Sequence, residues 1–445
     1  MEERSSYASL LLDTRLRRSS LSPVEKGLAT ELVYGVLRHR ERVDWILEKV
    51  SRRFIGVMET GLRNLLRLGA YQISFLDRIP PYAAVDEAVK LALRFMGKGC
   101  ASFVNAVLRE VSRQKGTIPY PDPHTDLVRY IATFHSHPSW LIERWIHRLG
   151  ERETISLAMA NNKIPPVSIQ VNPLKGSPGE LRSLLKGKVE VIEESPLVPN
   201  AFRLFGVPPL WDMDAFLQGR FSVMDEAAAL VVHVLDPRPG ETIIDACAGA
   251  GGKAALAAML TQDNIHILAM DLSRRALRRL EENLSRLGIR GVEGILLDAR
   301  DAGKRLSEKA DRVLVDAPCT GLGTLRRHPE IKWRLKPDSI KVLSNLQLEL
   351  LEGVLPCLKP GGVLVYSTCS TEPEENEGVI SQFIQAHPEI EVEDPSPFIP
   401  FPRKDLVGPS RFLQTWPHRH GVDGFFAARL RSRETKSDQK GHGGL

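Results

Sequence analysis

Residues 242–253, TIIDACAGAGGK, give the strongest indication of the fold, because an apolar run passes through a glycine-rich turn into a helical run. Glycines at such a turn let the backbone approach a ligand closely where a helix begins. Residues 249–254 satisfy the loose G-x-G-x-x-G/A dinucleotide pattern, whereas Ala254 after Lys253 excludes a Walker phosphate loop. The turn therefore predicts an α/β fold with a site for a nucleotide-like cofactor.

Strand-like and helix-like runs alternate from about residue 225 onward. This alternation is typical of a parallel sheet, in which ligands bind at the carboxyl ends of the strands. We expect strands at residues 242–246, 265–270, 292–297, 312–315 and 363–367, and helices at 253–260, 273–287 and 339–355.

Three aspartates end successive expected strands, namely Asp271, Asp298 and Asp316. One such residue would be read as a helix cap, but three beside the glycine turn line one cleft. Asp271 follows the turn at the spacing of a carboxylate that binds ribose hydroxyls. A nicotinamide dehydrogenase explains Asp271 alone, whereas S-adenosylmethionine uses a comparable adenosine site and leaves a further acid for its amino group. We therefore expect S-adenosylmethionine.

Two cysteines follow the last two expected strands, Cys319 after the 312–315 run and Cys369 after the 363–367 run. Methylation of cytosine at carbon 5 needs a thiolate that adds to carbon 6, a base that removes the carbon 5 proton, and a carboxyl for ring nitrogen 3. The two cysteines with Asp316 supply this set. Which cysteine attacks stays open at this point, because Pro318-Cys319 has the look of the nucleophile pair in DNA-type enzymes.

The remainder of the chain falls into further parts. Residues 1–150 read as all-helical, with a capping box that starts at Ser22 and a proline at the first helical position. Residues 160–224 read as a small α+β module, residues 225–432 as the catalytic domain, and residues 433–445 as a disordered tail. An arginine excess in the first part favours contact with an RNA backbone. These arginines are Arg15, Arg17, Arg18, Arg38, Arg40, Arg42, Arg52, Arg53, Arg63 and Arg67.

Composition bounds the class of protein. The 445 residues are 42% hydrophobic and carry a net charge of +5, which permits nucleic-acid binding without proving it. Five cysteines argue against a disulfide framework and for a reducing cytosol. No Cys/His spacing indicates zinc, and neither a membrane-spanning run nor a signal peptide is evident. We expect a cytoplasmic protein without metal, most simply a monomer.

Taken together, the motifs resemble those of the RNA 5-methylcytosine methyltransferases. The resemblance is carried by residues 316–321 (DAPCTG), 326–333 (RRHPEIKW), 367–370 (STCS) and 375–377 (ENE). The full-length layout is similar to the RsmB (Sun/Fmu) branch, which modifies small-subunit (16S) rRNA. That resemblance implies a NusB-like helical domain, an RRM-like module and a Rossmann-like S-adenosylmethionine-dependent methyltransferase domain.

The resemblance also implies roles for individual residues. Cys369 would be the nucleophile, Cys319 would assist product release, Asp316 would contact the base or the cofactor, and Lys253 would lie near the reacting centre. Residues 420–426 resemble the closing strand of the family. This chain departs from the usual turn, with Gly249-Ala250 in place of Ala-Pro and Ala254 in place of Thr. The cofactor site would comprise Cys247, Ala248, Gly249, Ala250, Gly251, Gly252, Lys253, Asp271, Asp298 and Asp316.

An alternative of a different class is an RNA-binding assembly or transcription factor in which the methyltransferase fold is secondary. In such a protein the methyltransferase domain could be inactive. The sequence argues against this, because it retains all of the expected catalytic residues, Cys369, Cys319, Asp316 and Lys253.

Overall fold

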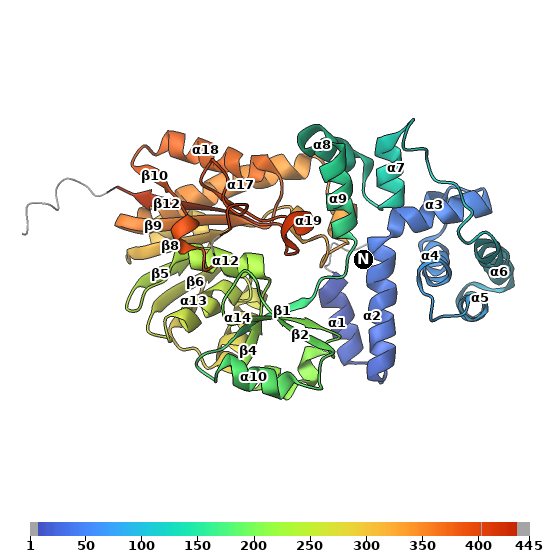
Figure 1. Cartoon of the computed structure of the whole chain (residues 1–445), viewed down its shortest axis with the longest axis horizontal. Helices are drawn as coiled ribbons and strands as arrows, with labels where there is room; N and C mark the ends of the chain where they lie inside the picture. Colours follow the sequence, from blue (N-terminus) through green and yellow to red (C-terminus); the bar gives the residue numbers. More distant parts are fainter. Residues whose placement is uncertain (1–7, 402, 434–445) are drawn as a thin grey trace, which may run out of the picture. The chain divides into compact units, whose positions relative to one another are not determined.

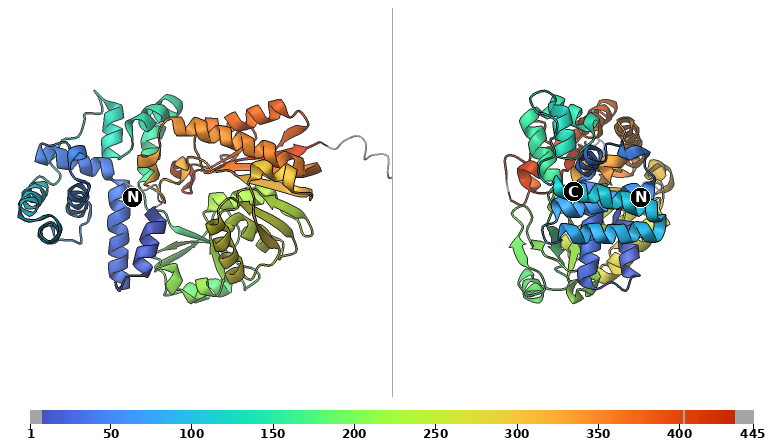
Figure 2. Two further views of the ribbon diagram at one scale, coloured as in Figure 1. Left: turned by 180° about the vertical axis from the view of Figure 1, so that it is seen from behind. Right: turned by 90° about the vertical axis from the view of Figure 1, so that its right-hand side faces the viewer.

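The computed structural model describes residues 8–401 and 403–433, and the chain divides into two compact units (Figures 1 and 2). The first unit comprises residues 1–164 together with Leu325–Arg334. The second comprises Pro165–Thr324 and Leu335–Leu445. Most of the expected tail, residues 434–445, lies outside the described residues.

Helices build the first unit, as predicted. The capping box at Ser22 is present, and Pro23 occupies the first helical turn. Buried aliphatic side chains of α3 to α6 form its core. The helices are α1 (Ala8–Arg17), α2 (Pro23–Arg38), α3 (Arg40–Ser51), η1 (Ile55–Val57), α4 (Thr60–Phe75), α5 (Pro81–Met96), α6 (Lys98–Arg113), α7 (Leu127–Phe134), α8 (Ser139–Leu149), α9 (Glu151–Asn161) and α16 (Ile331–Arg334).

The segment Leu325–Arg334 belongs to the helical unit although it lies far along the chain. Lys332 is buried there, and its ammonium donates to the carbonyls of Arg38 (2.9 Å) and Ser136 (2.7 Å) and to Oδ1 of Asn162 (3.1 Å). Those oxygens match the three donors of a lysine. Part of the motif at residues 326–333 therefore serves to fold the helical unit.

Two of the arginines expected to contact RNA are buried in this unit. Arg38 and Arg67 are 5% and 3% exposed. Arg67 pairs with both oxygens of Asp44 at 2.7 Å, and Arg38 donates to the carbonyl of Arg326 at 3.0 Å. For these two residues the expectation is wrong, because a buried guanidinium is committed to partners inside the fold.

A small antiparallel sheet opens the second unit, with strand order β2-β3-β1-β4. Ile169, Phe202, Leu204 and Phe221 of these strands pack in one core with Leu181 of α10. This is the predicted α+β module. Its elements are β1 (Val167–Val171), α10 (Pro178–Leu185), β2 (Val191–Glu194), β3 (Ala201–Phe205), η2 (Leu210–Asp212), α11 (Asp214–Leu217) and β4 (Phe221–Val223).

Specific hydrogen bonds fasten this module to the remainder of the second unit. Arg286 donates to the carbonyls of Phe216 and Phe221 at 2.8 and 3.0 Å, and its guanidinium lies over the Phe216 ring at 4.0 Å. The buried Asn172 amide donates to the carbonyls of Gly219 and Leu287, each at 2.8 Å. The module and the catalytic domain therefore form one compact body.

The large sheet has the order β10-β12-β9-β8-β5-β6-β7, with β11 paired to β12. Strands β5 to β9 run parallel, as predicted, and β12 adds to β9 in the antiparallel sense, as does β10 to β12. The strands are β5 (Thr242–Asp245), β6 (His266–Asp271), β7 (Val292–Leu296), β8 (Ala310–Asp316), β9 (Leu358–Thr368), β10 (Ile390–Glu393), β11 (Leu413–Gln414) and β12 (Phe426–Ser432).

The antiparallel edge corrects the expected closing strand. Within residues 420–426, His420 ends a short helix and only Phe426 lies in a strand. The turn residues between them, which include Gly421 in the left-handed region, lead the chain into β12.

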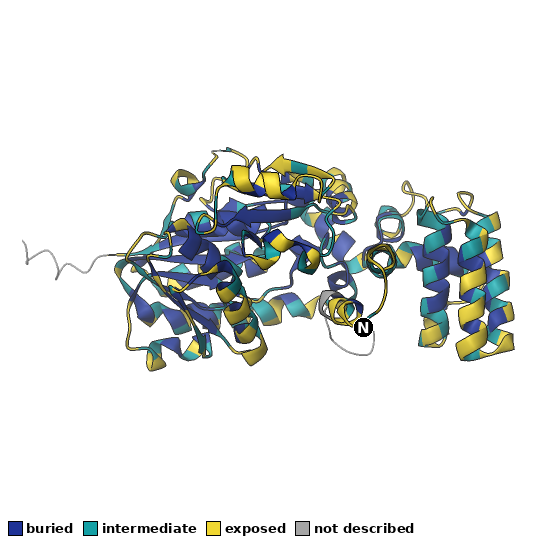
Figure 3. Cartoon of the chain, turned by 90° about the horizontal axis from the view of Figure 1, so that it is seen from below, coloured by how far each residue is buried: buried dark blue, intermediate teal, exposed yellow. Residues whose placement is uncertain are grey.

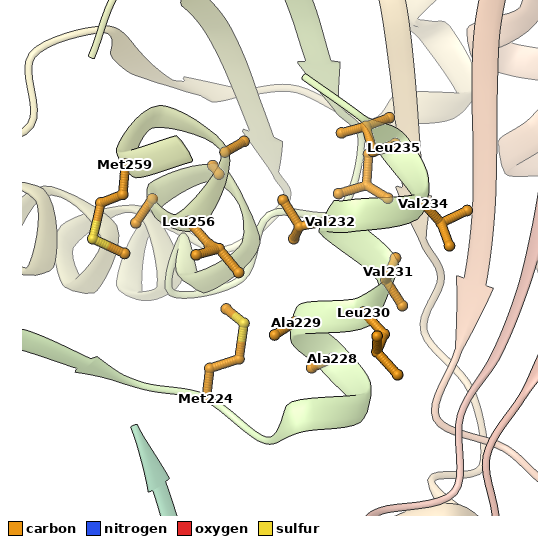
Figure 4. Packing of buried hydrophobic residues seen from close by; sticks show 14 of the residues in the cluster. Met224, Ala228, Ala229, Leu230, Val231, Val232, Val234, Leu235, Leu256 and Met259 are labelled. Atoms are coloured by element: carbon orange, nitrogen blue, oxygen red, sulfur yellow. The ribbon is translucent and has the colours of Figure 1, made fainter. Parts of the chain in front are cut away.

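Alternation along the parallel strands creates two cores, one on each face of the large sheet. Figure 3 shows that the strands of this sheet consist largely of buried residues. Ile243 packs in one core and its neighbour Ile244 in the other, because successive side chains of a strand point to opposite faces. Figure 4 shows α12 in the first core, where Val232 lies near Leu256 of α13. The helices are α12 (Glu226–Leu235), α13 (Gly252–Leu260), α14 (Arg274–Leu287), η3 (Ala299–Asp301), α15 (Ala302–Arg305), η4 (Leu322–Thr324), α17 (Asp338–Val354), η5 (Leu355–Cys357), η6 (Pro373–Glu375), α18 (Glu377–Ala386), η7 (Ser396–Phe398) and α19 (Pro417–His420).

Among the described residues, no helix has both the length and the apolar character that a membrane span requires.

Candidate active site

A cavity of about 300 Å³ lies at the carboxyl ends of β5 to β8. The volume falls within the range of small-molecule sites. Three of its lining residues are the strand-end aspartates singled out in the sequence. The lining comprises Ala246, Cys247, Asp271, Leu272, Leu297, Asp298, Ala299, Arg300, Asp316, Pro318, Leu346 and Leu350.

The glycine turn follows directly after Cys247, which lines this cavity. Gly249 and Gly251 have φ values of +58° and +75°, a left-handed conformation that glycine adopts without strain. A side chain at Gly251 would also lie 2.8 Å from Cγ of Leu280. The Gly249 amide donates to Asp271 at 3.0 Å and thereby fixes that carboxylate. Residues 248–252 and Lys253 are not among the residues that line the cavity.

Asp271 and Asp298 are held at their strand ends by neighbouring donors. Asp271 accepts the Ser273 amide at 2.7 Å, and Asp298 accepts the Arg300 amide at 3.0 Å together with its guanidinium. The guanidinium of Arg300 lowers the pKa of Asp298, although the little burial there acts in the opposite direction. Both carboxylates therefore present fixed acceptors to the cavity.

A lysine–carboxylate pair lies beside the cavity. Lys253 donates to Oδ2 of Asp316, whose other oxygen accepts the Ser367 hydroxyl at 2.7 Å. Burial lowers the pKa of Lys253, but the adjacent carboxylates of Asp316 and Asp245 outweigh that effect and raise it. The ammonium form of Lys253 is therefore favoured, and it is a charged hydrogen-bond donor beside the cavity.

The two predicted cysteines meet. The Sγ atoms of Cys319 and Cys369 are 3.3 Å apart although 50 residues separate them in the chain. The hydrogen bond with Cys369, burial and the neighbouring charges of Cys369 and Glu375 raise the pKa of the Cys319 thiol well above its usual value. One thiol of the pair therefore keeps its proton when the other ionises.

The other cysteine near the turn, Cys247, is half-buried and lines the cavity. Burial and the charges of Asp245 and Asp316 raise the pKa of its thiol. Cys247 therefore lines the cavity without being a good nucleophile, because its thiolate form is disfavoured.

Sequence reasoning missed two buried acids near this site. Burial and the charge of Asp316 raise the pKa of Asp245 to about 7. Glu375 is fully buried and contacts the loops that carry both cysteines. Asp245 could have been found from the sequence, because it is a carboxylate at the end of an otherwise apolar strand. Glu375 could not, because it lies in an acidic turn that gives no indication of burial.

Comparisons with known proteins agree along the whole chain. The NusB family model matches residues 1–113, a ferredoxin-like domain of RsmF/B-like methyltransferases matches 137–209, and the 16S rRNA methyltransferase RsmB/F model matches 232–431. The probable ribosomal RNA small subunit methyltransferase B of Bacillus subtilis is 36% identical over 435 residues, 97% of this chain and 96% of that protein. The chain belongs to the ribosomal RNA small subunit methyltransferase B family.

Other members of the methyltransferase B family and related structures are similar over comparable lengths. The Yersinia enterocolitica protein is 33% identical, covering 94% of this chain and 92% of that protein. The crystal structure of PH0851 has a TM-score of 0.80 with 31% identity and covers 94% of this chain and 92% of that one. A methyltransferase homologue from Pyrococcus horikoshii has a TM-score of 0.58 with 33% identity, over 68% of this chain and 97% of its own.

Membership of the methyltransferase B family identifies the cofactor as S-adenosylmethionine and makes the dehydrogenase alternative wrong. The residues present fit this cofactor. Asp271 offers a fixed carboxylate for ribose hydroxyls, and Leu272, Leu297 and Leu350 supply apolar walls for a flat base. Within residues 8–401 and 403–433, no group of three or more His, Cys, Asp or Glu side chains is arranged to hold a metal ion.

Proposed function

We propose that this protein transfers a methyl group to carbon 5 of a cytosine in small-subunit (16S) rRNA through a covalent bond between Cys369 and carbon 6. The observation that carries the proposal is the 3.3 Å separation of the two sulfurs beside the Lys253–Asp316 pair. The names of the relatives support rRNA as the substrate. S-adenosylmethionine, when bound, supplies an electrophilic methyl group.

Cys369 begins the reaction. Its thiolate adds to carbon 6, ring nitrogen 3 takes a proton from the Lys253–Asp316 pair, and carbon 5 gains the electron density needed to attack the methyl group. Lys253 and Asp316 hold that nitrogen and its proton in place. Once sulfur is bound to carbon 6, Cys369 no longer carries the charge that raises the pKa of Cys319.

Cys319 then assists release. After losing its own proton to water, its thiolate takes the proton from carbon 5, and the electron pair of that C–H bond forms the double bond between carbons 5 and 6. The bond between carbon 6 and sulfur breaks, with its pair returning to Cys369. The proton on ring nitrogen 3 returns to the Lys253–Asp316 pair, so 5-methylcytosine leaves and both cysteines are regenerated.

A trapping experiment tests this assignment. Wild type, Cys319→Ala and Cys369→Ala are each incubated with 16S rRNA transcript and S-adenosylmethionine, and protein–RNA adducts are resolved on a denaturing gel. We expect Cys319→Ala to accumulate adduct and Cys369→Ala to form none. The reverse pattern would exchange the roles of the cysteines, and absence of adduct in every variant while wild type still methylates would remove the covalent step. A transcript that accepts no methyl group while a precursor particle does would identify the particle as the substrate.

A further inference from the structure

A buried carboxylate joins the two loops that carry the cysteines. Glu375, in η6, has no exposed surface. Its Oε1 accepts the backbone amide of Thr320 at 2.8 Å and the Gln347 side-chain amide at 3.1 Å. Its Oε2 accepts the Thr320 hydroxyl at 2.5 Å and the Ser370 hydroxyl. Four donors converge on this carboxylate, which matches the acceptor capacity of an ionised glutamate.

The residues that Glu375 binds directly follow the reacting pair. Thr320 comes after Cys319, and Ser370 comes after Cys369. The hydroxyl oxygens of Thr320 and Ser370 are 3.0 Å apart, so this contact repeats the sulfur–sulfur contact one residue further along each loop. The position of one thiol relative to the other therefore depends on the carboxylate between the two loops.

The Cys319 loop has a second connection to the same group. Gln347 of α17 donates to Glu375 and also to the carbonyl of Pro318 at 3.0 Å. The Tyr366 hydroxyl donates to the backbone carbonyl of Glu375 at 2.5 Å and to Oε1 of Gln347 at 3.0 Å. These hydrogen bonds hold the Glu375 carboxylate in place, so the Cys319 and Cys369 loops are both anchored to a group of fixed position.

We propose that Glu375 is the positioning residue that keeps Cys319 within reach of carbon 5, the neighbour of the carbon bonded to Cys369, and that it controls the release step. The proposal rests on the covalent mechanism proposed above. Glu375 is connected to the reacting pair through Thr320, Ser370 and Gln347, so it acts through these residues. Its negative charge also contributes to the raised pKa of Cys319, after the hydrogen bond with Cys369 and burial. The carboxylate thereby favours the thiol form of Cys319 while Cys369 is the thiolate.

The test measures adduct release in single-turnover reactions of the full-length chain with 16S rRNA transcript and S-adenosylmethionine. Glu375→Gln keeps the shape of the side chain, removes the charge and replaces one of the two acceptor oxygens, of which Oε2 accepts both hydroxyls, with an amide NH2 group. Thr320→Val removes one of the four donors with little change in volume. Thr324→Val is the matched control, because Thr324 is a buried hydroxyl in the same loop that donates to the carbonyl of Gly321 at 2.8 Å and not to Glu375.

We expect Glu375→Gln and Thr320→Val to form the adduct and release it at least tenfold more slowly than wild type, with unchanged affinity for S-adenosylhomocysteine. Thr324→Val should release it at the wild-type rate. In a Cys319→Ala background, Glu375→Gln should add little, because both changes act on the same step.

Other results overturn the proposal. Release at the wild-type rate in Thr320→Val and in folded Glu375→Gln would show that the contact does not position Cys319. If Glu375→Gln lost both its affinity for S-adenosylhomocysteine and its ability to form the adduct, Glu375 would have a general structural role. If Cys319→Ala itself traps no adduct while wild type methylates, the covalent mechanism fails first and the positioning role falls with it. If Glu375→Gln does not fold, the rates of adduct release in Thr320→Val and Thr324→Val are compared. Equal rates in these two variants would overturn the proposal.

Discussion

Replacing Asp44 with alanine removes the carboxylate that partners a buried arginine in the helical unit. Arg67 donates to both oxygens of Asp44 at 2.7 Å, and the two side chains are 4% and 12% exposed. Because both charges are largely removed from water, the surviving guanidinium loses its counter-ion in a place where solvent cannot replace it. Breaking a buried pair on one side costs about 3–5 kcal/mol.

The lower end of that range applies, because Asn64 also accepts from Arg67 at 3.1 Å and Asp44 is not fully buried. We therefore expect a loss of about 3 kcal/mol in the local free energy of opening, which is roughly a hundredfold faster amide exchange at 1.4 kcal/mol per tenfold. Hydrogen exchange of α3 and α4 in the whole chain measures this quantity even where unfolding is not two-state.

Asp86→Ala is the matched control, since Asp86 pairs with Lys90 at 2.7 Å on an exposed face where both side chains are 61% exposed. Such a pair contributes about 0–1 kcal/mol. Asp44→Leu combined with Arg67→Met should recover much of the lost protection, because neither charge of the buried pair remains. The reasoning is refuted if Asp44→Ala changes exchange in α3 and α4 no more than Asp86→Ala does.

Three further predictions concern the active site and the helical unit. Lys253→Met should lower kcat by roughly 10²–10⁴ and leave affinity for S-adenosylhomocysteine nearly unchanged, because Lys253 pairs with Asp316 but does not itself line the cavity; labelled methyl transfer and calorimetry separate the two effects. Asp271→Ala should weaken S-adenosylhomocysteine binding by roughly 10- to 100-fold, the loss of hydrogen bonds to a charged group, and equal calorimetric affinities would contradict the assigned ribose contact. Burial, with Lys332 nearby, lowers the pKa of His39 to about 3, and burial lowers that of His135 to about 4. Since the unfolded chain takes up these protons near pH 6.5, the helical unit should lose stability as pH falls from about 6.5 toward 4, and His39→Phe should flatten the fall in exchange protection.

The local structure and the list of reactive groups could both be predicted from the residues alone. Alternating apolar runs located β5 to β9 to within a few residues at their carboxyl ends, because a strand and the turn that ends it are defined by neighbours in the chain. The glycine turn indicated a nucleotide-like site for the same reason, and the glycines at 249 and 251 indeed adopt left-handed backbone.

Tertiary structure alone decided which of those groups meet and which are buried. The contact between Cys319 and Cys369, the capture of both cysteine loops by Glu375, and the burial of Arg67 against Asp44 join residues separated by up to 55 positions. Lys332 donates to the carbonyl of Arg38 across 294 positions, within the helical unit. Hydrophobic periodicity reports one element at a time, so it carries no information on pairings that form when distant elements pack. A charged residue is the same letter in the sequence whether its side chain is exposed to water or paired in the interior. Only the packing of distant elements determines which of these environments it has.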